Sequence, residues 1–125
     1  MNNPLQFNLV LHKDNRGSLY VLDQINTSFF YPKRVFFLTQ IPTGISRGKH
    51  GHFECKQIII ALNGKIEIIW KNSDSSGIVQ LDEFQALFVP EGNWIEISSD
   101  KITTIAMVVA SEFFDSKDYF TREPI

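Results

Sequence analysis

The sequence predicts a single all-β domain, built either as a β-sandwich or as a closed barrel. Hydrophobic residues alternate with polar ones at the period of a strand, and turn-forming Gly, Pro and Asn residues recur at short intervals. Short strands separated by tight turns are typical of these two architectures. The length of 125 residues suits one domain, because an independent core usually occupies about 100–200 residues.

Each expected strand is an apolar or alternating run bounded by turn residues. The clearest is 65–71, where Ile66, Ile68 and Trp70 share one face and charged side chains occupy the other. The pair Asn63-Gly64 before it favours a tight hairpin, so 57–62 and 65–71 are predicted to be antiparallel neighbours. In chain order we expect strands over 7–11, 18–22, 34–39, 57–62, 65–71, 86–89, 94–97 and 102–110, and a helical turn within 112–121.

Composition excludes several classes of function. The 12 Lys and Arg residues against 14 Asp and Glu give a net charge of −2, so the chain lacks the positive field that holds a nucleic acid. A small anionic ligand bound by a few arginines remains compatible with this charge. No apolar run approaches the roughly 20 residues that span a bilayer. The first residues lack the pattern of a secretory signal, and Cys55 has no disulfide partner in the chain, so we expect a cytoplasmic protein without membrane segments.

Two of the three histidines, His50 and His52, are one residue apart. In a strand this spacing places both imidazoles on the same face. A pair of this kind can bind a metal ion or transfer protons near neutral pH. The alternative interpretation is an exposed pair on a loop, but the residues around the pair favour a functional role.

The residues around the pair form a known pattern. Gly44, His50, His52, Gln57 and Gly64 are spaced as in the first signature of the cupin superfamily, which this segment resembles. Cupins usually have Glu where this chain has Gln57. This resemblance implies a jelly-roll β-barrel.

The second cupin signature is only partly present. Residues 90–92 supply its Pro-x-Gly, but Ile95 stands where a further histidine is usual. Two histidines and a neutral amide are a poor ligand set for Fe, Mn or Zn. We therefore expect no catalytic metal ion, and we assign the histidine pair to acid and base chemistry.

A narrower resemblance covers nearly the whole chain. Residues 47–52 read Arg-Gly-Lys-His-Gly-His, and segments 16–19, 33–37 and 110–119 accompany them in order. These four segments together resemble the dTDP-4-keto-6-deoxyhexose 3,4-ketoisomerases, the WxcM-like sugar-nucleotide cupins, whose histidine segment reads Arg-Gly-x-His-Ala-His. The resemblance implies one cupin-like sugar 3,4-ketoisomerase domain over residues 1–125.

The resemblance also implies a reaction. A base removes the C3 proton of a 4-keto sugar, an enediol forms across C3 and C4, and a proton returns to C4. No redox cofactor is required, and a histidine has a suitable pKa for the base without large adjustment. By this resemblance His52 is the principal base, and His50 orients it or moves the proton between the oxygens.

Several other side chains are candidates for binding a dTDP-linked sugar. Arg47 adjoins the histidines and Arg34 lies on the preceding strand, where a guanidinium suits a diphosphate or an enolate oxygen. Arg16 is a third candidate, and for each arginine a solvated surface charge is the alternative. Gln57 is a candidate anchor for the histidines or fills a polar niche. Trp94 is a candidate for stacking on thymine or sugar, although core packing is the commoner role of such an aromatic.

Two departures from the family pattern leave alternatives open. Family members commonly have a tyrosine where this chain has Phe36 and Phe37, and a polar residue where it has Ile95, so proton donors are lost. A non-catalytic nucleotide-sugar-binding cupin is therefore the second hypothesis, and a 3,5-epimerase of the same substrate is the third. By resemblance, the 3-keto product would supply an aminotransferase in the synthesis of a dideoxy-amino sugar for lipopolysaccharide or O-antigen. A homodimer is also predicted, with strand 7–11 as an edge for strand exchange.

Overall fold

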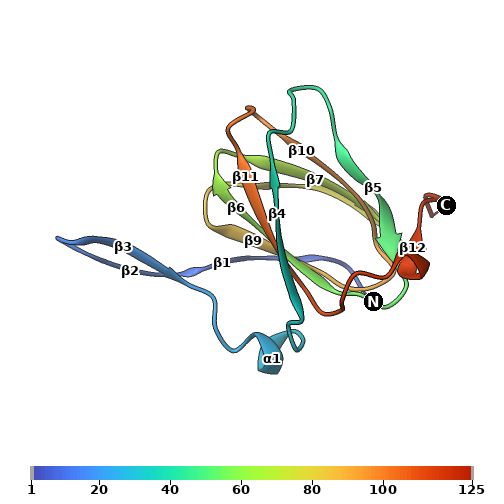
Figure 1. Ribbon diagram of the computed structural model, residues 1–125, viewed down its shortest axis with the longest axis horizontal. Coiled ribbons are helices and arrows are strands. Elements are labelled where there is room, and N and C mark those ends of the chain that lie inside the picture. The colour runs from blue at the N-terminus through green and yellow to red at the C-terminus, as the bar shows by residue number, and fades with distance from the viewer. Residues whose placement is uncertain (1, 125) are drawn as a thin grey trace.

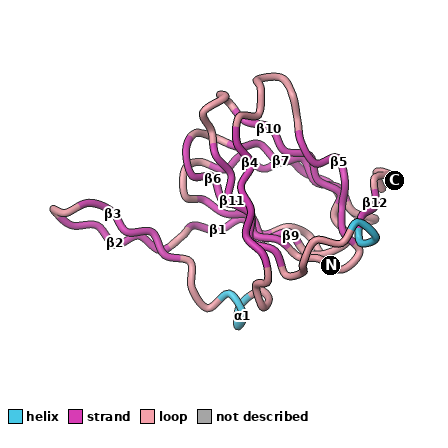
Figure 2. Tube along the Cα trace, viewed as in Figure 1, coloured by secondary structure: helices cyan, strands magenta, loops and turns pink. Residues whose placement is uncertain are grey.

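The computed structural model describes residues 2–124, which form two five-stranded antiparallel sheets and a separate two-stranded ribbon (Figure 1). The predicted domain limits at 1 and 125 lie outside the described residues. The only helical segments among those described are α1 (Ile25–Ser28) and the 3-10 turn η1 (Ser116–Asp118), as the cyan segments in Figure 2 show. The prediction of an all-β chain is thus confirmed, and so is the helical turn within 112–121. No helix of the described part is long and apolar enough to cross a membrane.

The two large sheets face each other. The first has the order β1 (Leu5–Asn8), β9 (Gln85–Val89), β6 (Gln57–Asn63), β11 (Ile105–Ala110), β4 (Arg34–Thr39). The second has the order β12 (Tyr119–Phe120), β5 (Arg47–His52), β10 (Trp94–Ser99), β7 (Ile66–Lys71), β8 (Ser76–Leu81). Among the described residues, the edge strands of the two sheets do not pair with each other. These residues therefore form a β-sandwich and not a closed β-barrel.

The core explains why β6 is apolar on both faces. Ile59 and Ala61 point between the sheets, where they join a cluster that includes Ile66 and Ile68 of β7. The alternate residue Ile58 belongs to a second cluster on the outer face of the first sheet, which it shares with Phe30 and other aromatic side chains near α1. Because β6 is covered on both faces, its sequence is a continuous apolar run and not an alternating one. The predicted buried strand is therefore confirmed.

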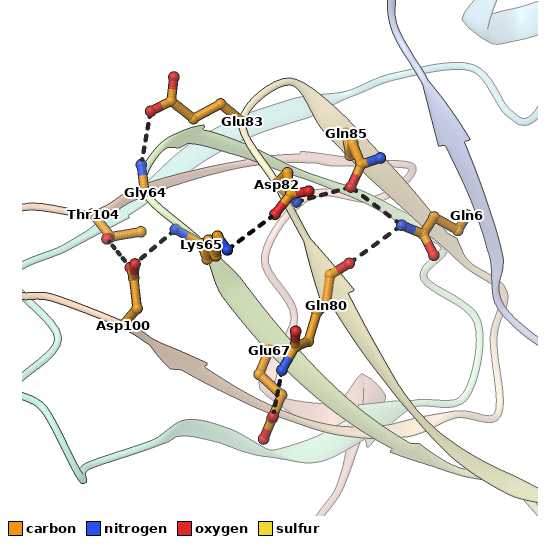
Figure 3. Close-up of polar contacts among 10 residues, drawn as sticks. All are labelled: Gln6, Gly64, Lys65, Glu67, Gln80, Asp82, Glu83, Gln85, Asp100 and Thr104. Carbon is orange, nitrogen blue, oxygen red and sulfur yellow. Dashed lines mark hydrogen bonds and ion pairs between the residues drawn. The ribbon is translucent and has the colours of Figure 1, made fainter.

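The predicted hairpin between β6 and β7 is wrong. β6 pairs with β9 and β11, whereas β7 pairs with β8 and β10 in the other sheet. Side chains take the backbone donors at the turn: Gly64 N–H donates to Glu83 Oε1 at 3.3 Å and Lys65 N–H donates to Asp100 Oδ1 at 2.9 Å (Figure 3). Gly64 has a positive φ, as expected, with a value of 82°. This conformation does not form a hairpin; it directs the chain from the first sheet into the second.

Replacing Gly64 by Ala should be costly. A Cβ at this position would lie 2.2 Å from Thr104 Oγ1, in addition to the unfavourable φ. We expect Gly64→Ala to lower the free energy of unfolding by about 2–4 kcal/mol, as the sum of backbone strain and overpacking. Gly92→Ala is the matched control, because Gly92 has a φ of 83° but no atom within 4 Å of the added Cβ. Equal losses for the two variants in urea denaturation would show that the contact with Thr104 has no effect.

Other boundaries also differ from the prediction. The strand expected over 7–11 is interrupted: β1 ends at Asn8 against β9, and β2 (Val10–Asp14) begins the ribbon. The strand expected from residue 102 begins only at Ile105. Strands β5 and β8, the short β12 and the helix α1 were not assigned from the sequence.

The ribbon of β2 and β3 (Gly17–Val21) extends away from the two sheets (Figure 1). It carries exposed apolar side chains, of which Val10 and Leu19 have 56% and 61% of their surface accessible. Tyr20 stacks on Phe84 at 3.9 Å between ring centroids, which attaches the base of the ribbon to the first sheet. A two-stranded ribbon is only marginally stable by itself. Because exposed apolar side chains that lie together often mark an interaction site, the ribbon is a candidate interaction surface.

Candidate active site

A pocket of about 340 Å³ opens between the edges of the two sheets. On the first sheet its wall includes Arg34 of β4 and Gln57 of β6, and on the second it includes Arg47 and His50 of β5. Tyr119 of β12 also lines it. Four of the residues predicted from the sequence therefore meet here. The apolar part of the lining is Phe36, Phe37, Leu38, Ile95, Ile97 and Val108, which includes the departures noted in the sequence.

A β-bulge in β5 sets the orientation of the histidine pair. The pairing with β10 shifts between Ile95, which opposes His50, and Glu96, which opposes Gly48. The extra residue, Lys49, has a φ of 56°. A bulge of this type re-aims the side chains that follow it. His50 and His52 then project on the same side of the strand, with 5.3 Å between ring centroids.

His50 presents a free nitrogen to the pocket. Its Nδ1 lies 3.0 Å from the carbonyl oxygen of Gly48. A carbonyl only accepts, so Nδ1 carries the proton and the lone pair of the neutral ring is on Nε2. The ring stacks on Tyr119 at 4.3 Å and 7° between planes, which fixes its orientation. His50 is thus a half-buried base with a defined tautomer.

His52 lies deeper, and a carboxylate holds it. Its Nδ1 is 3.1 Å from Asp118 Oδ2, so its lone pair is also on Nε2. That Nε2 is buried and has no partner among the described residues. The Asp118 carboxylate is itself fixed, because the backbone N–H groups of Glu54 and Cys55 donate to it at 2.8 and 3.0 Å.

Burial lowers the pKa of His52 below the usual 6.5. Loss of hydration is the main cause and the nearby His50 adds to it, whereas the Asp118 carboxylate acts in the opposite direction. His52 is therefore neutral at physiological pH.

The lowered pKa of His52 predicts a pH dependence of stability. Below pH 6.5 the unfolded chain binds a proton at this position before the folded chain does. The contribution of His52 is thus complete above pH 6.5 and is lost as the pH falls toward its folded pKa, with a slope of at most about 1.4 kcal/mol per pH unit. In urea denaturation across this range, His52→Gln should flatten the curve relative to the unaltered chain. An unchanged slope would contradict the assignment.

The two pocket arginines differ in their surroundings. The Arg34 guanidinium lies over the rings of Phe36 and Phe114, at 5.0 and 5.9 Å from the centroids, and its buried Nε has no partner among the described residues. Arg47 is exposed at the rim. Because the Arg34 guanidinium lines the pocket and Arg47 lies beside it, the pocket favours an anionic ligand.

The structure does not bring Arg16 or Trp94 to this pocket. Arg16 is at the tip of the ribbon, where it pairs with Asp14 at 2.7 Å and is fully exposed. Trp94 is buried, and its Nε1–H donates to the carbonyl oxygen of Thr121 at 3.2 Å. Within this chain Trp94 therefore has the core-packing role that the sequence left open.

Sequence reasoning missed two residues of the site. Asp118 and Tyr119 lie more than 60 residues after the histidines, and the pairing of β12 with β5 places Tyr119 opposite His52. The only signal for them was the C-terminal segment of the family resemblance. No spacing rule connects a two-residue strand to a distant histidine pair.

Two adjacent imidazoles beside a cationic, half-apolar pocket are suited to removing a proton next to a carbonyl group and stabilising the enolate that forms. Residues 3–123 match the family described as "WxcM-like, C-terminal" (FdtA). The chain therefore belongs to this family, which confirms the resemblance inferred from its four sequence segments.

Three proteins similar to this chain are named as isomerases. A TDP-4-oxo-6-deoxy-α-D-glucose-3,4-oxoisomerase of Aneurinibacillus thermoaerophilus is 28% identical over 110 residues, which cover 87% of this chain and 79% of that protein. The crystal structure of QdtA, a sugar 3,4-ketoisomerase of Thermoanaerobacterium thermosaccharolyticum in complex with TDP, matches with a TM-score of 0.87 and 29% identity, over 96% of this chain and 88% of QdtA. The TDP-quinovose 3,4-ketoisomerase WlaRB of Campylobacter jejuni matches with a TM-score of 0.89 and 27% identity, over 98% and 95% of the two chains.

Proposed function

We propose that this protein is a 3,4-ketoisomerase acting on a TDP-linked 4-keto-6-deoxyhexose. The observation that carries the proposal is the imidazole of His50, which lines the pocket together with Arg34 and has the ring of His52 beside it. The two solved structures named above share the fold over nearly the whole chain, and all three relatives are named as isomerases of such sugars. The two sheets would then be the halves of a cupin-type jelly roll.

The geometry supports a division of labour between the histidines. His50 lines the pocket and has its lone pair on Nε2, so it is the group able to take the C3 proton and return it to C4. His52 would act as its partner, with the Asp118 carboxylate stabilising the positive charge that forms on the pair. The sequence resemblance gives these roles in the opposite order, but the burial of His52 Nε2 favours His50 as the base.

The pocket arginines would bind the charged parts of the substrate. Arg34 lines the pocket and is suited to the enolate oxygen, while the exposed Arg47 is suited to the diphosphate. Gln57 is buried beside them and would orient a sugar hydroxyl. No metal ion or redox cofactor is needed for the proposed proton transfer.

The test of this function is conversion of the substrate. The chain incubated with TDP-4-keto-6-deoxyglucose should give the 3-keto isomer, detected by NMR as the movement of the carbonyl carbon from C4 to C3. Saturable binding without conversion would overturn the proposal and support the non-catalytic nucleotide-sugar-binding alternative. Conversion would place the chain before an enzyme that consumes a 3-keto sugar, such as an aminotransferase.

The exposed ribbon supports the predicted homodimer. Both the homodimer and the predicted cytoplasmic location remain proposals. An apolar groove of about 390 Å³ on the outer face of the first sheet, lined in part by Leu22, Val35 and Met107, offers a surface that a second chain could cover. In such a dimer Arg16 would lie away from its own pocket and near the partner chain. Light scattering should give the mass of two chains, and Leu19→Glu on the ribbon should convert the dimer to a monomer. A monomeric mass for the unaltered chain would contradict the proposal.

A further inference from the structure

His52, Cys55 and Asp118 form a cluster behind the pocket that the proposed reaction does not fully use. One ligand atom from each residue lies within 4.8 Å of the other two. We propose that this cluster is an inhibitory site for a divalent transition-metal ion such as Zn²⁺. The binding part of this inference is independent of the proposed function, whereas the inhibition rests on it.

The geometry is close to that of a metal site. His52 Nδ1 and Asp118 Oδ2 are 3.1 Å apart. With metal–ligand bonds of about 2.0–2.3 Å, a tetrahedral ion holds its ligand atoms about 3.3–3.7 Å apart, so a pair at the 4.8 Å limit must close by about 1 Å. Rotation of the Cys55 side chain can supply this change, because its thiol has only a weak contact, 3.5 Å to the carbonyl oxygen of Lys56.

The surrounding backbone already holds the Asp118 ligand in place. Besides the N–H groups of Glu54 and Cys55, which donate to the Asp118 side chain, Phe53 N–H donates to the Asp118 carbonyl oxygen at 2.9 Å. The loop after β5 is thereby tied to η1. The ion would find a preformed frame, and little ordering of the chain would be required on binding.

The donor set and its charge select the ion. A thiol sulfur, an imidazole nitrogen and one carboxylate oxygen suit Zn²⁺, Co²⁺ or Cd²⁺ and do not suit Mg²⁺ or Ca²⁺, which prefer oxygen ligands. On binding, the Cys55 thiol releases its proton to solvent, and the proton on His52 Nδ1 moves to Nε2. The thiolate and the carboxylate then balance the two positive charges of the ion, so the buried site is neutral.

This site differs from the metal set of the cupin signatures. It uses Nδ1 of His52, the nitrogen that contacts Asp118, and it takes its other ligands from a loop and from the C-terminal turn. Binding there separates His52 from Asp118 and converts Nε2 of His52 from an acceptor into a donor. The histidine pair then loses the carboxylate that stabilises its positive charge, so the ion should inhibit the isomerase.

The test is titration of the full chain with Co²⁺, followed by absorption spectroscopy. A thiolate-to-cobalt charge-transfer band that saturates at about one ion per chain is expected, with tetrahedral d–d bands and displacement by Zn²⁺. Cys55→Ser should lose the band and bind at least about 10-fold more weakly, while Mg²⁺ should produce no change. Cys55→Ala serves the same purpose if a buried serine hydroxyl prevents folding.

The outcomes separate this inference from the proposed function. Zn²⁺ should inhibit turnover by the unaltered chain, and Cys55→Ser should resist inhibition while retaining its metal-free activity. Absence of the thiolate band, or equal Co²⁺ affinity of the two chains, would overturn the metal site. A saturating band without inhibition would overturn the regulatory role, and a saturating band in a chain that never isomerises the sugar would count against the proposed function alone.

Discussion

Replacing His50 by Asn is expected to lower kcat/KM for the isomerisation by about 10³–10⁴-fold with the fold retained. Asn fills a similar space but cannot accept the C3 proton. Because His50 is only half-buried, we expect no large loss of stability. Circular dichroism and urea denaturation should show a folded chain. The rate should be measured with saturating and limiting substrate, because a group that acts only in the transition state lowers kcat and kcat/KM alike.

His52→Asn is the comparison that decides between the two histidines. The sequence resemblance predicts the larger loss for His52, whereas the lining of the pocket predicts it for His50. A folded His50→Asn chain with full activity would remove His50 from the reaction. In that case the buried Nε2 of His52 would have to become accessible when the sugar binds.

Replacing Asp118 by Asn is expected to lower kcat by about 100-fold, because the amide no longer supplies a negative charge and can present an N–H to His52. Since the carboxylate raises the pKa of His52, its loss should lower that pKa further. The acid limb of the pH–rate profile should therefore move to lower pH. A residue with only a structural role would not move this limb.

Asp115→Asn is the matched control for Asp118→Asn. Asp115 accepts a hydrogen bond from Lys117 N–H at the start of the same turn, but it is exposed and forms no hydrogen bond with His52. Its replacement should leave kcat and the pH–rate profile unchanged. Unaltered kcat and an unaltered acid limb in a folded Asp118→Asn chain would show that the carboxylate does not act through His52.

Local pattern was sufficient for much of the fold. The strand over 34–39 was predicted with its observed limits, and the run after residue 57 was recognised as buried because all its side chains are apolar. β8 was missed because Ser76-Gly77 is typical of a turn. In the structure Gly77 is required by packing, since a Cβ there would lie 2.8 Å from the ring of Trp70.

The errors arise where side chains distant in sequence determine the structure. The turn at Asn63-Gly64 has hairpin chemistry, yet Glu83 and Asp100 take its backbone donors and the next strand enters the other sheet. The histidine pair was predicted from its spacing, but the residues that fix its tautomers were not. Gly48 contributes through its backbone carbonyl oxygen at the bulge, and Asp118 contributes through a turn 66 residues further along the chain, which no local sequence signal connects to His52.

The site of isotope exchange tests the central claim most directly. In heavy water, the proposed reaction predicts deuterium at C3 of TDP-4-keto-6-deoxyglucose recovered before equilibrium, and none when His50 is replaced by Asn. Exchange at C5 would contradict this account and support the epimerase alternative. Absence of both exchange and conversion with bound substrate would contradict proton transfer by the histidine pair altogether.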